Sequence, residues 1–114
     1  MTEYERMSGM PPRRRLILDA PYHDQFLRWE REGWPKKWRY SGDAIRRARE
    51  KIPYGWPTVH NYVEMQKVTL RDVLSKTRAE IAAMPGVGRA TMRVFGSFLV
   101  HFSLTTADGW DGTS

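Results

Sequence analysis

The stretch Met84-Pro85-Gly86-Val87-Gly88-Arg89-Ala90-Thr91 says more about the fold than any other part of this 114-residue chain. Pro85 cannot continue a helix, because its ring clashes with the preceding turn and it has no N–H to donate. Gly86 and Gly88 permit a positive φ and close backbone approach, and Val87 between them can point inward. The stretch therefore predicts a tight turn that ends one helix and begins another.

Signals on both sides of this turn predict the two helices. Thr77 is a suitable N-cap and Glu80, three residues later, completes a capping box, so a first helix should begin near Arg78. Ile81 and Met84 give that helix its apolar stripe. A second helix should begin near residue 89. Its predicted buried side consists of apolar residues that recur at helical spacing: Met92, Phe95, Leu99 and Phe102.

The start of the second helix is a candidate anion site, because the N–H groups of a first helical turn have no intrahelical acceptor and carry the positive end of the dipole. Thr91 adds a hydroxyl, and Arg93 lies one turn from residue 89 on the same face. The alternative is a tight helical hairpin that needs its small residues only for packing.

The segment from Ile81 to Phe95 resembles the helix-hairpin-helix family of DNA-binding proteins. Residues 58–104 as a whole resemble the C-terminal domain of the bacterial RNA polymerase α subunit. Residues 59–65 stand in the place of its first helix, residues 68–74 in the place of its short turn, and the hairpin and residues 94–99 follow in order. The resemblance implies an all-α fold and binding to double-stranded DNA.

Carried over residue by residue, the resemblance assigns backbone phosphate contacts to Gly86, Val87 and Gly88 and side-chain contacts to Arg89 and Thr91. Asn61 lies near the position of a family asparagine. Thr58 stands where that family inserts an arginine into the minor groove, and Glu64 stands where it has a lysine. We therefore expect a grip on the sugar–phosphate backbone with little reading of bases.

No catalytic set emerges from the sequence. The hairpin is similar to that of helix-hairpin-helix DNA glycosylases, but Ala90 stands where those enzymes have their attacking lysine. His23, His60 and His101 are far apart and lack metal-ligand spacing, and His101 is expected to be a partly buried structural residue. No phosphate loop or nucleophile motif is present. We expect a non-enzymatic protein that needs no metal, no cofactor and no small-molecule substrate.

Charge and composition favour an anionic partner. The chain has a formal net charge of +6 and no cysteine, which fits nucleic acid as partner and a reducing cytoplasm as location. No apolar run is long enough to span a membrane. The charge is uneven: residues 1–57 hold 13 Lys and Arg against 8 Asp and Glu, whereas residues 58–114 hold 6 against 5. Strong electrostatic affinity would therefore have to come from the N-terminal half.

The N-terminal half predicts two helices joined by an aromatic segment. The first should run from Tyr22 to Arg31, with Tyr22, Phe26 and Trp29 on its buried face and a glycine ending it. Residues 34–40 interleave aromatic and cationic side chains. That pattern suits nucleic acid. It equally suits a surface loop whose tryptophans anchor in the core, and we favour this interpretation because buried tryptophans often anchor small domains.

A second N-terminal helix should run from Ala44 to Lys51, capped by Ser41 or Asp43. Its arginines form a basic face that is solvated by default and that would support DNA binding if it faces a duplex: Arg46, Arg47 and Arg49.

The sequence thus predicts a single all-α domain of about five short helices, in which a helix-hairpin-helix packs against an N-terminal aromatic helical pair. We divide it into a mobile basic arm (1–18), an aromatic and basic helical extension (19–57), the hairpin domain (58–104) and a flexible tail (105–114) with one docked ring. Two functions remain open. One is a DNA-binding protein, transcription-associated or encoded by a mobile element. The other is a protein-interaction module of the same fold that docks on a partner such as RNA polymerase.

Overall fold

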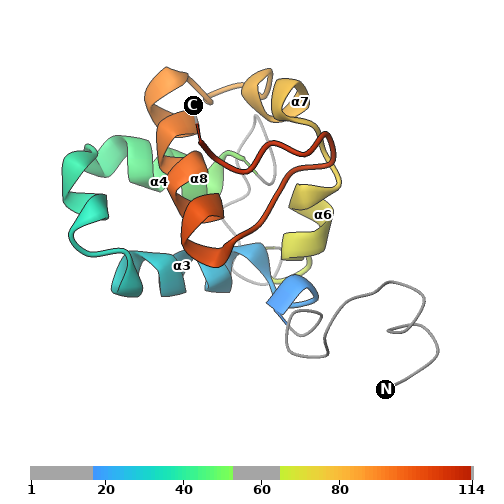
Figure 1. Cartoon of the computed structure of the whole chain (residues 1–114), viewed down its shortest axis with the longest axis horizontal. Helices are drawn as coiled ribbons and strands as arrows, with labels where there is room; N and C mark the ends of the chain where they lie inside the picture. The colour runs from blue at the N-terminus through green and yellow to red at the C-terminus, as the bar shows by residue number, and fades with distance from the viewer. Residues whose placement is uncertain (1–16, 53–64, 114) are drawn as a thin grey trace.

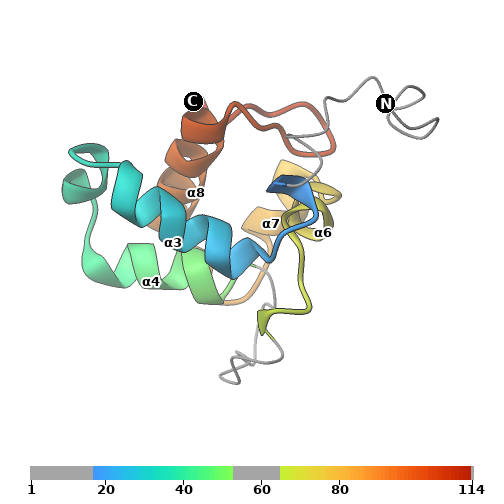
Figure 2. The ribbon, with the colours of Figure 1, turned by 90° about the horizontal axis from the view of Figure 1, so that it is seen from below.

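A computed structural model describes residues 17–52 and 65–113 of the chain. Its elements are α3 (Tyr22–Glu32), the short 3₁₀ helix η1 (Lys36–Arg39), α4 (Gly42–Glu50), α6 (Leu70–Leu74), α7 (Arg78–Ala82) and α8 (Arg89–Phe102). In Figure 1, α8 is central, with α3 and α4 on one side and α6 and α7 on the other, and Figure 2 shows the same division from below. The predicted all-α class is confirmed, since the described residues contain helices and a single isolated β-bridge.

The helix boundaries follow local capping chemistry. The Thr77 hydroxyl accepts from the Glu80 N–H at 3.1 Å, and the Glu80 carboxylate accepts from the Thr77 N–H at 3.0 Å, so the predicted capping box is confirmed. A second box, between Thr69 and Asp72, opens α6. At α4 the structure decides between the two predicted caps, because the Ser41 hydroxyl accepts from the Ala44 N–H at 3.1 Å.

One core serves the whole described chain. The predicted buried face of α3 is confirmed, since Tyr22, Phe26 and Trp29 have no exposed surface. These rings pack on α8, with ring centroids 5.6 Å apart for Tyr22 and Phe98 and 5.5 Å apart for Phe26 and Phe98. The hairpin unit therefore packs against the N-terminal helices as predicted, and the two segments share a single hydrophobic core.

The buried face of α8 differs from the predicted one. Phe95 and Leu99 are fully buried as expected, but Met92 and Phe102 are only partly buried. The centre of the face is made instead by Thr91, Val94, Phe95, Phe98 and Leu99. Both sets follow the helical period, and the observed set is rotated from the predicted one toward α3 and α4.

The C-terminal segment is packed, whereas the sequence predicted a flexible tail with one docked ring. In Figure 1 it runs out beside α6 and α7 and returns to α8. The Ala107 N–H donates to the Lys76 carbonyl at 3.0 Å, and Thr106 is buried. Near the end of the segment, a Cβ placed on Gly96 of α8 would lie 2.6 Å from the Gly112 carbonyl oxygen. The small residues that suggested flexibility instead allow this close contact.

Candidate functional site

The turn between α7 and α8 has the conformation that its glycines predict. Gly86 has a φ of +84°, which L side chains rarely adopt. Val87 is partly buried against the core, as expected for the residue that points inward. Gly88 is the extended N-cap of α8, with no side chain to cap it. The hairpin thus presents an exposed, uncapped helix start.

Backbone donors are available at that helix start. The Met92 N–H donates to the Gly88 carbonyl at 3.0 Å, the first such bond of α8. Within the part of the chain that the structure describes, the N–H groups of residues 89–91 therefore have no intrahelical acceptor. Donors of this kind, at the positive end of a 14-residue helix, favour an anion.

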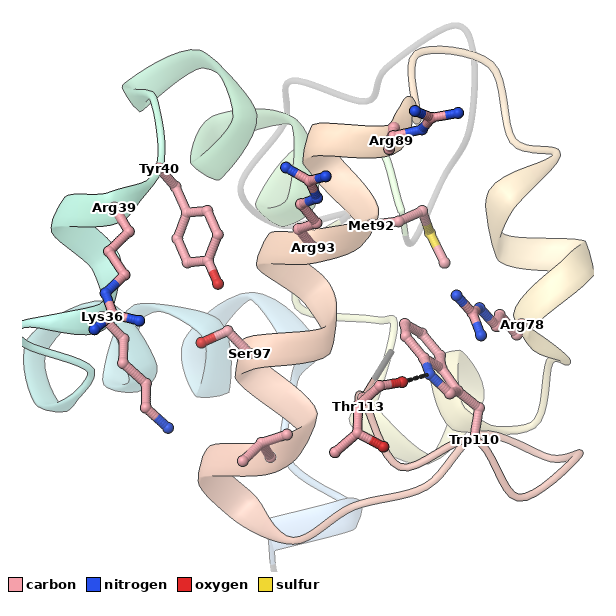
Figure 3. Close-up of a pocket in the computed structure, with 12 residues that line it drawn as sticks. Lys36, Arg39, Tyr40, Arg78, Arg89, Met92, Arg93, Ser97, Trp110 and Thr113 are labelled. Carbon is pink, nitrogen blue, oxygen red and sulfur yellow. Dashed lines mark hydrogen bonds between the residues drawn. The ribbon is translucent and has the colours of Figure 1, made fainter.

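A groove lies along the outward face of α8, beside this helix start. Its volume is about 800 Å³. Five of its lining residues are cationic: Lys36, Arg39, Arg78, Arg89 and Arg93. We call it the basic groove. In Figure 3, Lys36 and Arg39 approach from the η1 side of α8 and Arg78 from the opposite side. No Asp or Glu is among the described residues that line it, so its charge is positive throughout.

The remaining lining residues of the basic groove are apolar, hydroxylic or small. They are Tyr40, Met92, Ser97, Val100, Trp110, Gly112 and Thr113. The Ser97 Oγ is buried without a hydrogen-bond partner among the described residues. The Arg78 guanidinium lies 4.4 Å from the centre of the Trp110 ring, and this contact fixes the arginine at the groove wall.

The three arginines of α4 are placed differently, because each is paired with a carboxylate. Arg46 lies 2.9 Å from Asp43 and 3.0 Å from Glu50. Arg47 lies 2.9 Å from Asp43, and Arg49 lies 3.0 Å from Glu30 of α3. The hydrogen bond from Arg46 is the main cause that lowers the pKa of the Asp43 carboxyl. The predicted basic face is therefore electrically balanced.

By contrast, none of the five cations of the basic groove is within ion-pair distance of a carboxylate in residues 17–52 and 65–113. The groove has formed because the fold brings Lys36 and Arg39 from the N-terminal half to the side of α8 that carries Arg89 and Arg93. The groove is therefore strongly positive although the net charge of residues 58–114 is close to zero. Lys36 and Arg39 belong to the segment 34–40 whose pattern suits nucleic acid, but nothing in the sequence spacing links them, or Arg78, to the hairpin.

Other predicted site residues are placed less favourably. Thr91 is 3% exposed, because it lies on the inward face of α8 one turn before Phe95. Its hydroxyl is therefore not presented to a ligand. Asn61, Thr58 and Glu64 lie outside the described residues, as does nearly all of the predicted first helix at residues 59–65.

The aromatic segment after α3 also differs from the favoured interpretation. Trp34 is 59% exposed and Trp38 is 71% exposed, so neither indole anchors in the core. Their ring centroids lie 5.3 Å apart with planes at 82°. The position that a tryptophan anchor would occupy is filled by Trp29 of α3, which is fully buried.

A histidine of the described residues forms a structural pair with a carboxylate. The His101 side chain is 27% exposed, as expected for a partly buried structural residue, and its Nε2 lies 2.9 Å from a carboxylate oxygen of Glu32. Hydrogen bonds from His101 and Arg28 lower the pKa of Glu32. The described part of the chain holds no group of three or more His, Asp or Glu side chains able to bind a metal ion. It also holds no helix of the length and apolarity that crossing a membrane requires.

Comparison with models of protein families, with curated proteins and with solved structures found no match to this chain.

Proposed function

We propose that this protein binds double-stranded DNA without catalysis, by gripping the phosphate backbone at the start of α8 and along the basic groove. One observation carries the proposal. Five cations without carboxylate partners among the described residues line one groove beside an uncapped helix start. In water these cations are neutralised by counterions, and phosphate binding is favoured because it releases counterions into solution.

The chemistry of the groove suits phosphate in particular. Four of its five cations are arginines, whose planar guanidinium groups donate to two phosphate oxygens at once. Arg89 and Arg93 are separated by one helical turn, about 6 Å along the axis, so each can contact a separate phosphate. The backbone N–H groups of residues 89–91 supply further donors, and none of these contacts depends on base identity.

The proposal modifies the prediction made from sequence. Arg89 and Arg93 keep the role assigned to them, and Gly86 and Gly88 remain candidates for the backbone contacts predicted there. Val87 leaves the contact set, because its N–H donates to the Met84 carbonyl at 3.1 Å. Thr91 leaves the contact set because it is buried. Arg46, Arg47 and Arg49 leave it because a phosphate would have to compete with Asp43, Glu50 and Glu30 for them.

The test compares two double variants that remove the same charge. Arg89→Ala with Arg93→Ala removes two groove cations, whereas Arg46→Ala with Arg47→Ala removes two that are already paired. Binding to a random-sequence duplex is measured by fluorescence anisotropy between about 50 and 200 mM salt. If all five groove cations meet phosphates, the logarithm of affinity should fall against the logarithm of salt with a slope of about −4.5.

The groove variant should lower the magnitude of that slope by about 2 and weaken binding on every sequence. The α4 variant should leave the slope close to that of the wild type. Equal effects from the two variants, or a duplex affinity that does not respond to salt, would overturn the proposal. Failure to bind DNA at all would favour the protein-docking alternative.

A further inference from the structure

Two exposed tryptophans stand next to the basic groove and are not explained by contact with a duplex backbone. Trp34 and Trp38 keep 59% and 71% of their surface in water, although large aromatic side chains are among the first to be buried. They contact each other edge to face at 5.3 Å. Such a paired, exposed aromatic patch marks a binding surface.

The packing of α3 explains why these rings stay outside the core. A Cβ on Gly33 would lie 2.7 Å from the Trp29 carbonyl oxygen and 3.0 Å from its Nε1, so the chain leaves α3 directly against Trp29. The Trp29 ring also packs against Phe26, with ring centroids 5.2 Å apart. None of the residues of η1 is buried.

The geometry of η1 joins the tryptophans to the groove. A 3₁₀ helix repeats every three residues, which places Lys36 and Arg39 on one face, and both line the basic groove. Trp38 lies on another face and lines a neighbouring hollow of about 450 Å³ together with Lys37 and Tyr40. Tyr40 lines both spaces, so Trp38 and the basic groove adjoin one common side chain, and Trp34 is joined to them through its contact with Trp38.

We propose that Trp34 and Trp38 form a stacking platform for unpaired bases, and that the preferred ligand is a junction between double-stranded and single-stranded DNA. The inference rests on the proposed backbone grip, which would hold the duplex in the basic groove and direct its unpaired strand over η1. Aromatic side chains interleaved with cations are the means by which proteins hold single strands, because every base offers a ring face.

Charge favours nucleic acid over a protein as the occupant. Lys36 and Lys37 lie between the two tryptophans in the sequence and Arg39 follows Trp38, and the described residues give none of the three an ion pair with a carboxylate. Lysine is depleted at the centres of protein–protein interfaces, whereas phosphates of a single strand need such cations at every step. The platform therefore matches a strand whose bases stack while its phosphates meet η1.

The test uses three ligands with the same duplex of about 20 base pairs. The first is blunt, the second carries a thymine tail of about eight nucleotides, and the third carries an abasic tail of equal length and charge. Each is titrated against the wild type, Trp34→Ala with Trp38→Ala, and Trp34→Tyr with Trp38→Tyr. Both tryptophans are exposed, so these variants should fold as the wild type does, which circular dichroism checks.

The wild type should bind the thymine-tailed duplex about 10- to 100-fold more tightly than the blunt one, and the abasic tail should restore only the part due to charge. The alanine variant should lose this preference while it binds blunt duplex unchanged, and the tyrosine variant should keep much of it. Blunt binding without a preference for the thymine tail would overturn this inference and leave the proposed function standing.

Loss of binding to all three ligands by the wild type would overturn both proposals. If the wild type shows no preference for the thymine tail but self-associates in sedimentation, and the alanine variant does not self-associate, the tryptophans form a protein contact instead. Equal loss of blunt and tailed binding in the alanine variant would also contradict a base-stacking role.

Discussion

Replacing Gly88 by aspartate should separate DNA binding from folding, because the two respond in opposite directions. Gly88 is extended, with φ −103° and ψ −172°, and a Cβ there meets nothing within 4 Å. Aspartate therefore fits without strain and can cap α8, which now has no side-chain cap. The cap is worth a few tenths of a kcal/mol over glycine, and the carboxylate gains about 0.3–1 kcal/mol from the helix dipole.

The same carboxylate should oppose a phosphate at the start of α8. Two like charges about 5 Å apart repel by about 1 kcal/mol in water and about 3 kcal/mol near a protein surface. Gly88→Asp should therefore bind duplex DNA roughly 5- to 150-fold more weakly, while its melting temperature stays equal or rises. Anisotropy titration and thermal circular dichroism measure the two quantities on the same sample.

Gly88→Asn is the matched control, since asparagine caps a helix about as well as aspartate but carries no charge. It should gain similar stability and lose much less affinity. The reasoning is refuted if the aspartate and asparagine variants are both more stable and both bind duplex DNA as the wild type does. In that case no phosphate lies at this helix start.

Two further predictions concern stability. Burial is the main cause that raises the pKa of Tyr22, so the stability that its protonated hydroxyl contributes is complete below the unfolded pKa near 10 and is lost as pH rises above it. Tyr22→Phe should lower the free energy of unfolding by about 1 kcal/mol at neutral pH, because the hydrogen bond to the Ala48 carbonyl is lost. In urea unfolding, the variant should lose less stability than the wild type above about pH 10. Gly96→Ala should force the C-terminal segment away from α8, since its Cβ would meet the Gly112 carbonyl. We expect the free energy of unfolding to fall by about 1–2 kcal/mol and the Ala107 amide hydrogen to exchange faster with solvent. An unchanged exchange rate would show that the segment is not held there.

Local signals in the sequence were sufficient to predict much of the fold. The capping box at Thr77 and Glu80, the start of α8 and the buried face of α3 all depend on residues within a turn or two of one another. Local signals left two alternatives for the N-cap of α4, because Ser41 and Asp43 are both residue types that cap helices. Only the backbone geometry selects Ser41.

The groove and the tryptophan pair depend on contacts between distant segments, which spacing does not encode. Arg49 pairs with Glu30 across two helices, and this contact removes it from the basic surface that its sequence neighbours suggested. Lys36 reaches the groove only because η1 lies beside α8. Trp38 is exposed because Trp29 already fills the core, and a composition rule cannot decide which tryptophan is placed inside.

The shared core has a consequence for the order of events while the chain is being made. Tyr22 and Phe26 emerge from the ribosome early, but the ring on which both pack, Phe98, lies near the other end of the described chain. The aromatic face of α3 therefore stays without its partner until the segment that carries Phe98 has been made, because contacts of long sequence separation form only when both segments are present. During that interval the exposed aromatic face makes the nascent chain prone to aggregation.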